Sequence, residues 1–432
     1  MAVTVLRRLR SSSEHRFYGW NIVAAGAVNN FLTAGLAVWG FGVYVSPLRE
    51  EFGWSTAAIA AGFSIRSFQQ GFLAPLAGII VDRFGPRQVA VVGSLLMVAG
   101  LLLFASTQSL WMYYLASVLM AMGQSASSFT AFSTAVMRWF ARKRGRAMGT
   151  MHAGNGAGYF LVPGVAFIVA VGGWREALVI SAVLVLVIAL PLALVLRNSP
   201  SDLGLAPDGD APLPRADSTA TVNAAGLSGS SLGEAMHTST FWLIALAQAC
   251  GGASVQGWVV HTIPHLENVG FSLGAATMIG VGYAVCQLIF RPATGLIADR
   301  VGRKRIFVIS FLLQSVGMLA FASLSSERFW LLPVYYATFA AGQAAWVVLQ
   351  AAIVADYFGP RRFATINGVV NTIQMPVGVI SPIAAGYVFD HAGSYAPVFI
   401  VYSGMSIVAA GSILLIRRQT WGARAETLPA AA

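Results

Sequence analysis

The stretch PLAGIIVDRFGPR, from Pro75 to Arg87, occurs a second time as PATGLIADRVGRK, from Pro292 to Lys304. The proline, the aspartate and the last glycine of the two copies are all separated by the same offset, roughly half the chain. A signature repeated in register at this distance indicates a duplicated protein.

Both copies have the same order of residue types. An apolar run ends at an acid and a base, which a glycine and further bases follow. This order predicts a membrane helix that ends at water, a very tight turn and a return into the membrane. We expect Gly85 and Gly302 to adopt the positive φ of such a turn. We expect Asp82 and Asp299 to accept hydrogen bonds from exposed helix-end amides.

Composition places the chain in the membrane. Hydrophobic residues make up 57% of the 432 residues and charged residues only 10%, whereas a soluble globular protein carries about 25% charged residues. The net charge of +11 is not a nucleic-acid signal, because the bases lie in short runs between apolar segments, as membrane topology requires. We therefore expect a lipid bilayer and no nucleic acid as partner.

Twelve apolar segments are each long enough to cross the ~30 Å hydrocarbon layer. Six lie in each half, and the prediction is an all-α membrane protein of two pseudo-symmetric six-helix bundles. The segments are Trp20 to Ser46, Thr56 to Val81, Gln88 to Ser106, Leu110 to Val136, Ala147 to Val171, Ala177 to Leu196, Phe241 to His265, Leu273 to Ala298, Ile306 to Ser323, Trp330 to Val354, Ala364 to Phe389 and Tyr395 to Ile416.

Charge predicts the orientation. Of 27 Lys and Arg residues, all but Arg49, Arg66, Arg175, Arg291 and Arg328 fall in the tails, the linker or the loops on one side. That side is the cytoplasm by the positive-inside rule. The predicted domains are a cytoplasmic N-terminal tail at 1–19, bundles at 20–197 and 241–416, a flexible cytoplasmic linker at 198–240, and a cytoplasmic C-terminal tail at 417–432.

Arg291 is the most informative charge. All sixteen acids fall in tails, loops or span ends. Arg291 lies eight residues before Asp299, or about 12 Å of helix, which places it near the midplane. A guanidinium there is costly unless it meets a cavity or a counter-ion, and a planar fork suits a substrate carboxylate. The alternatives are snorkelling, or bonding to backbone carbonyls that Pro292 frees.

Other polar residues in the spans are weaker candidates. Tyr283 and Gln287 precede Arg291 by eight and four residues and share its helix face. Any single mid-span polar residue is more often interhelical glue than a ligand, but polar residues occur in both halves and favour a central cavity. The pocket candidates are Arg291, Gln287, Tyr283, Asn30, Tyr159 and Gln343.

Three further residues have open roles. Arg66 lies about 24 Å of helix before Asp82, near the outer interface, where a structural and a functional role are equally plausible. His261 and His265 lie at the outer end of their span. They could sense external pH, although interfacial histidines are more often structural.

The sequence contains no nucleotide-binding loop, metal-ligand cluster or nucleophilic triad, so no cofactor, metal or enzymatic role is expected. Gly154, Gly156 and Gly158 resemble a dinucleotide fingerprint, but no strand precedes them, and close helix packing explains them better. The two cysteines, Cys250 and Cys286, lie in apolar runs and imply no disulfide framework.

The chain resembles the major facilitator superfamily through its duplicated loop, its six-plus-six spans and its polar linker. Further signatures resemble the bacterial monocarboxylate-transporter and oxalate/formate-antiporter branch over essentially the whole chain. They are Tyr18-Gly19-Trp20, Phe41-Gly42-Val43, Pro47-Leu48, Glu51 to Ser55, Pro200, Asp202, Gly204, Pro207-Asp208-Gly209, Arg291-Pro292 with Gly295, Gly386-Tyr387, Asp390 and Gly393-Ser394-Tyr395.

The resemblance implies alternating access about a central site, with Arg291 binding a substrate carboxylate. It also implies that the loop residues Asp82, Arg83 and Arg87 help to latch the cytoplasmic side, and the second copy adds Asp299 and Arg300.

The chain departs from this branch at the charged positions. Animal-type monocarboxylate transporters have an acid where Gln287 stands and a lysine in segment 1, and the oxalate exchanger has a lysine in segment 11. The chain has none of these. One midplane cation matches a monocarboxylate better than a dicarboxylate, while proton symport, exchange and uniport all stay open.

The sequence therefore predicts a bacterial-type inner-membrane transporter of a small organic monoanion such as lactate or pyruvate, with a monomeric functional unit. The rivals are a same-fold exporter of hydrophobic or drug-like compounds, a dicarboxylate or anion exchanger, and a transport-inactive sensor.

Overall fold

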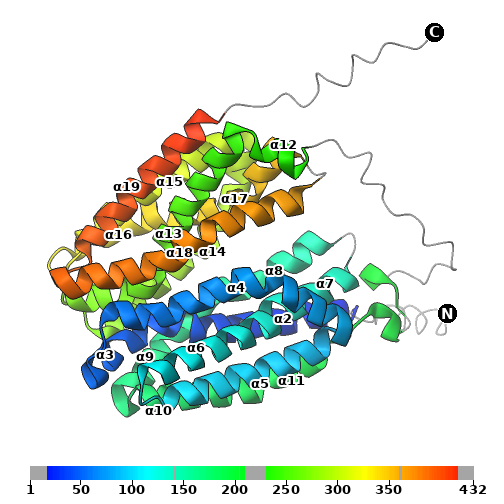
Figure 1. The fold of residues 1–432 in the computed structure, drawn as a ribbon, viewed down its shortest axis with the longest axis horizontal. Helices are drawn as coiled ribbons and strands as arrows, with labels where there is room; N and C mark the ends of the chain where they lie inside the picture. The colour runs from blue at the N-terminus through cyan, green and yellow to red at the C-terminus, as the bar shows by residue number, and fades with distance from the viewer. Residues whose placement is uncertain (1–16, 141–142, 204, 210–229, 360–361, 417–432) are drawn as a thin grey trace, which may run out of the picture. The chain divides into compact units, whose positions relative to one another are not determined.

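The structure is a computed structural model that describes residues 17–140, 143–203, 205–209, 230–359 and 362–416. Within these ranges the chain is almost entirely helical and contains no strand. The predicted all-α class is therefore confirmed. Figure 1 shows the helices as long rods, each running beside its neighbours within its own part of the chain.

The first half contains the six predicted helical stretches, four of them interrupted by a short 3₁₀ or π segment. Their elements are α2 (Gly19–Ala37), η1 (Trp39–Tyr44), α3 (Val45–Phe52), α4 (Thr56–Phe84), α5 (Pro86–Ala105), α6 (Leu110–Gln124), η2 (Ser125–Ala131), α7 (Phe132–Trp139), α8 (Arg144–Ala157), η3 (Gly158–Leu161), α9 (Val162–Gly172), α10 (Trp174–Leu184), η4 (Val185–Ala189) and α11 (Leu190–Val195).

The second half repeats the count of six. Its elements are α12 (Leu232–Met236), α13 (Ser239–Asn268), α14 (Leu273–Val301), α15 (Arg303–Ala322), η8 (Phe329–Leu331), α16 (Leu332–Tyr335), η9 (Tyr336–Ala340), α17 (Ala341–Phe358), α18 (Phe363–Ala392) and α19 (Ala396–Leu415).

Length and composition support the membrane assignment. Among the described residues, 10 helical stretches are long and apolar enough to span a bilayer. The other two predicted spans are α4, with 29 residues, and the continuous stretch from α6 through η2 to α7. Together they make the twelve predicted spans. The predicted linker begins with two 3₁₀ turns, η5 (Pro200–Leu203) and η6 (Pro207–Gly209), and its residues 210–229 lie outside the described part.

The chain forms two compact units. Unit 1 comprises Met1–Pro47 and Phe72–Ala216, and unit 2 comprises Leu48–Gly71 and Asp217–Ala432. The beginning of α4 therefore packs with the second half of the chain, whereas its end packs with the first half. The predicted bundle boundaries at 20–197 and 241–416 stay predictions.

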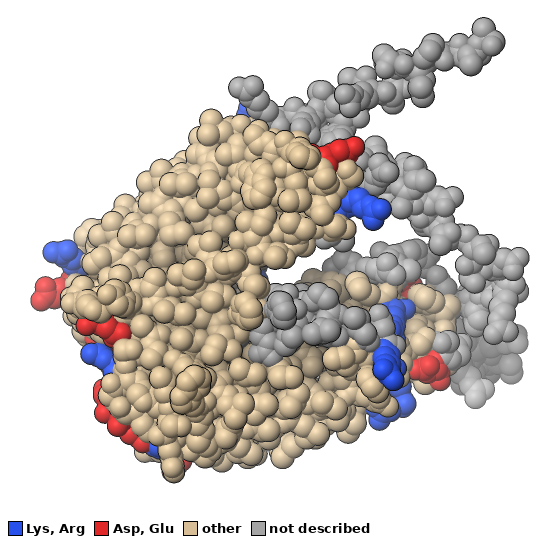
Figure 2. All heavy atoms as spheres, in the orientation of Figure 1, with Lys and Arg blue, Asp and Glu red and all other residues tan. Residues whose placement is uncertain are grey.

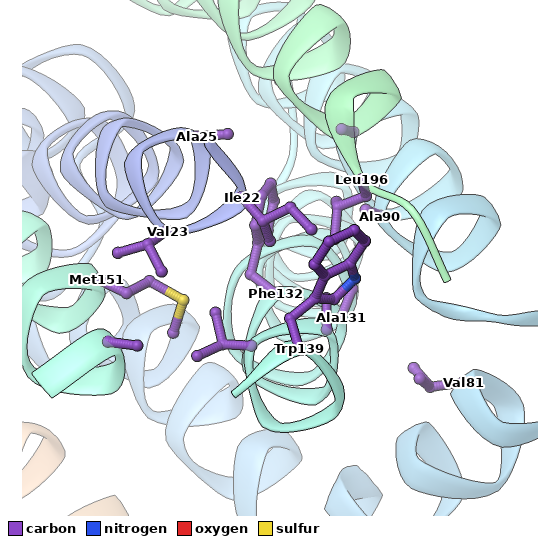
Figure 3. Packing of buried hydrophobic residues seen from close by; sticks show 14 of the residues in the cluster. Ile22, Val23, Ala25, Val81, Ala90, Ala131, Phe132, Trp139, Met151 and Leu196 are labelled. Atoms are coloured by element: carbon purple, nitrogen blue, oxygen red, sulfur yellow. The ribbon is translucent and has the colours of Figure 1, made fainter. Parts of the chain in front are cut away.

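The core of unit 1 packs around Trp139, at the end of α7. Its indole is fully buried, and Nε1 donates a hydrogen bond to the Arg197 carbonyl at 3.1 Å. Figure 3 shows Ile22 of α2, Phe132 of α7 and Met151 of α8 converging on the same cluster. In unit 2 the equivalent packing is aromatic, with Phe321 stacked on Tyr335 at 4.9 Å between ring centroids.

The two repeated loops turn as predicted. Gly85 has φ 81° before α5, and Gly302 has φ 101° before α15. These angles lie in the region that glycine adopts without strain, so the prediction for both glycines is confirmed. The side chains of Asp82 and Asp299 lie outside the described part. In Figure 2 the charged side chains gather near helix ends, and tan residues fill the sides between them.

Glycines also set the contact between α2 and α8. A Cβ on Gly154 would strike the Ala27 carbonyl oxygen, and one on Gly158 would lie 2.7 Å from the Gly35 nitrogen. Two members of the predicted glycine triplet therefore serve close helix packing, as expected.

Candidate binding site on α14

The site starts from the helix that carries Arg291. Ser272 caps α14 by accepting a hydrogen bond from the Ala275 nitrogen at 3.2 Å, which satisfies one of the helix's free amides. Pro292 lies inside this helix. The predicted common face of Tyr283, Gln287 and Arg291 follows from the four-residue spacing.

Arg291 is bonded within its own helix. Its Nε donates to Oε1 of Gln287 at 2.9 Å, and the side chain is partly exposed. No hydrogen bond from its other two nitrogens, and no ion pair, is recorded within the described residues. The predicted alternative, bonding to carbonyls freed by Pro292, is not what these contacts show. The outer edge of the guanidinium is thus left for another partner.

Gln287 in turn connects α14 to the tenth span. Its Nε2 donates to the Ala340 carbonyl at 3.0 Å, and the side chain is only 3% exposed. Ala340 ends the π turn η9, and π turns are frequent at functional sites. Tyr336, at the start of the same turn, donates its hydroxyl to the Ile279 carbonyl at 2.8 Å. Two bonds therefore hold α14 against η9.

Gln343 follows one turn after Ala340, on α17. It is 4% exposed, and its Oε1 is buried without a hydrogen-bond partner in the described part of the chain. An unpaired buried acceptor costs free energy, and such atoms call for an explanation. A ligand donor beside Gln343 would satisfy it.

Two further polar atoms, Nε1 of Trp346 and Oε1 of Gln374, have no hydrogen-bond partner among the described residues. A Cβ on Gly251 of α13 would lie 2.9 Å from Nε1 of Trp346. A Cβ on Gly252 would lie 2.6 Å from Nε2 of Gln374. The glycine pair therefore leaves room for both polar side chains against α13. Sequence reasoning missed this juxtaposition, because it depends on three helices that are distant in the chain.

Tyr283 packs within a group of aromatic rings. The Tyr283 ring lies 4.7 Å from Trp258 of α13 and 6.0 Å from Phe339 of η9, between ring centroids. Trp258 and Tyr283 are almost fully buried. Tyr283 therefore packs as part of the core, and its predicted role in the pocket stays a prediction.

Asn30 and Tyr159 lie in unit 1. Nδ2 of Asn30 donates to the Met151 carbonyl at 3.2 Å, joining α2 to α8. The Tyr159 ring packs against Trp39 at 5.5 Å between centroids. Both side chains are buried. These contacts fit a structural role, and a shared cavity with Arg291 stays a prediction.

The predicted gating residues are only partly described. The Arg83 guanidinium lies over the Phe84 ring at 5.5 Å from its centroid. The backbone nitrogen of Arg87 donates to Oδ1 of Asn198 at 3.3 Å. Arg300 is exposed. An ion pair that the sequence did not reveal joins Arg303 to Asp356 at 2.7 Å.

Of the residues with open roles, His261 and His265 are fully buried, while the Arg66 side chain lies outside the described part. Among the described residues, no group of three or more His, Cys, Asp or Glu side chains is placed to hold a metal ion. On α14 the structure thus brings together one cation, Arg291, and the neutral amide of Gln287 that its Nε contacts.

Comparison with known proteins is consistent with this geometry. The model of the family described as Major Facilitator Superfamily matches residues 29–281 and 243–430. Monocarboxylate transporter 11 of Mus musculus is 28% identical over 406 residues, covering 92% of this chain and 86% of that protein. The oxalate:formate antiporter of Oxalobacter formigenes is 25% identical, covering 66% and 64%. The probable sulfoacetate transporter SauU of Cupriavidus necator is 24% identical, covering 85% and 87%.

Solved structures support the fold alone. The nucleoside transporter NupG superposes with a TM-score of 0.72 at 15% identity, covering 92% of this chain and 98% of that one. A bacterial homologue of the human lysosomal transporter Spinster, in an inward-facing and occupied conformation, gives 0.69 at 16% identity, covering 92% and 96%.

Proposed function

The chain belongs to the Major Facilitator Superfamily, and on that premise we propose that it carries a small organic monocarboxylate by alternating access, with Arg291 binding the carboxylate. Its relatives are transporters and not enzymes. The monocarboxylate and the role of Arg291 are the parts that experiment has to test.

The single observation that carries the proposal is the way Arg291 is held. Its Nε donates to Gln287 at 2.9 Å, which restrains the guanidinium. The two terminal nitrogens have no hydrogen-bond or ion-pair partner among the described residues, and such a pair can bind the two oxygens of a carboxylate. A bare guanidinium within a span costs several kcal/mol, so an anionic substrate gains affinity by neutralising it.

Charge number favours a monoanion. Arg291 is the only Lys or Arg within the six predicted spans of the second half, and a second substrate carboxylate would be left unpaired in a poorly hydrated site. The printed names of three relatives concern organic anions, namely monocarboxylates, oxalate and formate, and sulfoacetate. They support the anion class without selecting a member of it. Lactate and pyruvate are the first substrates to test.

The remaining parts of the proposal follow from the family and from charge. We place the protein in the inner membrane with both termini in the cytoplasm, because the basic loops lie on that side. Asp82, Arg83 and Arg87, with Asp299 and Arg300, would latch the cytoplasmic side. The functional unit would be a monomer.

The test is uptake and counterflow of labelled lactate and pyruvate in proteoliposomes. Wild type should show saturable flux, Arg291→Gln should lose most of it, and Arg291→Lys should recover little, because an ammonium lacks the fork. Arg328→Gln is the matched control, since Arg328 is an exposed arginine and its replacement should leave flux unchanged. Normal flux in Arg291→Gln, or transport of hydrophobic cations in place of carboxylates, would overturn the proposal. Oxalate exchange would favour the dicarboxylate rival.

A further inference from the structure

Two histidines of α13 lie buried outside the site described above. His261 and His265 both have exposed fractions of 0%. Their four-residue spacing puts them on one face of the helix. They belong to unit 2, as do all the residues that surround them below.

Each ring is anchored by one nitrogen. Nε2 of His261 lies 2.8 Å from the Pro382 carbonyl of α18, and Nε2 of His265 lies 3.0 Å from the Phe321 carbonyl of α15. A carbonyl oxygen only accepts, so Nε2 must carry the hydrogen in both rings. In a neutral imidazole the other nitrogen, Nδ1, is then a bare acceptor.

Both Nδ1 atoms are buried and have no hydrogen-bond partner among the described residues. Two unpaired acceptors on one helix face are a costly arrangement for a purely structural pair. Each Nδ1 lone pair can also accept a proton. The sixteen acids of the chain all fall in tails, loops or span ends, so these imidazoles are strong candidates for a proton-binding group within the second unit.

The rings adjoin a charged cluster. Tyr395 packs on His261 at 5.0 Å and on His265 at 6.1 Å between ring centroids. Three charged groups act on this neighbourhood: Asp390 of α18, Glu267 of α13 and Arg49 of α3.

Asp390 holds the start of α4. Its two carboxylate oxygens accept hydrogen bonds from the Thr56 nitrogen at 2.9 Å and the Ala57 nitrogen at 3.1 Å. A carboxylate at a helix N-terminus both pairs free amides and complements the helix dipole. Gly386 permits the approach, because a Cβ there would lie 2.6 Å from the Ala57 nitrogen. A distant helix thus supplies the cap of α4.

We propose that His261 and His265 form the proton-binding site of this transporter, and that a proton there competes with the start of α4 for Asp390. A proton on Nδ1 of either ring adds a positive charge and a donor that needs an acceptor. Asp390 is the carboxylate whose charge acts on His261. Attraction between Asp390 and the imidazolium weakens the hydrogen bonds that Asp390 accepts from the amides of Thr56 and Ala57.

A proton on the histidines and the Asp390 cap on α4 therefore oppose each other. Binding can shift a conformational equilibrium only through such a difference in affinity between two states. With the orientation proposed above, the histidines lie at the outer end of α13. External protons would then favour release of α4 and opening toward the outside. The coupling of this site to substrate flux rests on the proposed function, whereas the titration of the rings does not.

The first experiment needs no substrate. ¹⁵N-histidine spectra are recorded in nanodiscs between pH 8 and pH 3.5, with the other four histidines replaced by glutamine. We expect Nδ1 of at least one ring to gain a proton reversibly toward the acid end of this range, because burial disfavours the charged imidazolium. We also expect Asp390→Asn to weaken proton binding, because it removes the attracting charge. Two rings that stay neutral down to pH 3.5 would overturn the proposal.

The second experiment measures coupling. In wild type, an inward gradient of one pH unit should raise the accumulation of carboxylate about tenfold if one proton accompanies one anion. His261→Gln with His265→Gln should abolish this stimulation while keeping counterflow at equal pH. His391→Gln is the matched control, since His391 is exposed at the end of α18, and it should behave as wild type.

The two proposals fail in different ways. Proton-stimulated accumulation that persists in the double variant refutes the histidine site and leaves the carboxylate assignment intact. Absence of any carboxylate counterflow in wild type refutes the transport proposal, while the spectra still decide whether the rings bind protons.

Discussion

Arg291 donates from Nε to Oε1 of Gln287, one helical turn earlier, at 2.9 Å. The pair replaces the acid and arginine that animal-type monocarboxylate transporters have at these positions. A neutral amide orients the guanidinium without neutralising it. On the proposed function, the positive charge of Arg291 then stays available to a substrate, and a charged residue at position 287 would compete for it.

Gln287→Glu should make transport depend on acidity. The new carboxylate would pair with Arg291 and compete with the substrate, so we expect the KM for lactate at pH 7.5 to rise at least about tenfold, equivalent to one pKa unit of interaction. Lower pH protonates the glutamate and should restore the affinity. The measurement is KM between pH 5.5 and 7.5, and a pH-independent KM equal to that of wild type would contradict the expectation.

Gln343→Met should move stability and binding in opposite directions. The change removes a buried oxygen that has no partner, which should stabilise the empty protein by about 1 kcal/mol. The same change should weaken substrate binding if Gln343 lines the pocket. Thermal unfolding and counterflow KM test the two effects. Gln287→Met is the contrast, because it breaks two hydrogen bonds and should lower both the thermal stability and the affinity for substrate.

Gly154→Ala should destabilise unit 1. The added methyl would strike the Ala27 carbonyl, and overpacking of this kind costs about 1–3 kcal/mol. Gly149→Ala is the control in the same helix, since a Cβ there meets nothing within 4 Å. Thermal unfolding should separate the two variants, and equal melting temperatures would show that α2 and α8 do not depend on this contact.

Gly302→Ala tests the turn of the second repeat. The φ of 101° is strained for any residue with a Cβ, although no atom lies within 4 Å of its position, so the expected cost of about 1–3 kcal/mol is purely conformational. Gly404→Ala, inside α19, should instead stabilise by up to about 1 kcal/mol. Opposite shifts in melting temperature are the expected result.

Features with a local signal were predictable. The turn glycines and the length of α14 could be derived from spacing, and so could the common face of Gln287 and Arg291. The acceptors of His261 and His265 could not, because they are carbonyls on α18 and α15. The cap that Asp390 supplies to α4 could not either, since 334 residues separate Thr56 from its partner. Such contacts depend on packing between distant segments, which periodicity does not encode.

The π turn η9, Tyr336–Ala340, accommodates one residue more than an α-helical turn. Its hydrogen bonds run from residue i to i+5, so the extra residue is absorbed within the turn and the helix beyond it keeps its facing. Deletion of Thr338 alone would convert the turn into regular α-helix and leave Gln343 and Trp346 on the same side of the tenth span. A deletion from regular α-helix would instead rotate every later side chain by about 100° around the axis. The π turn is therefore the part of this span that can lose a residue without reorienting the residues after it.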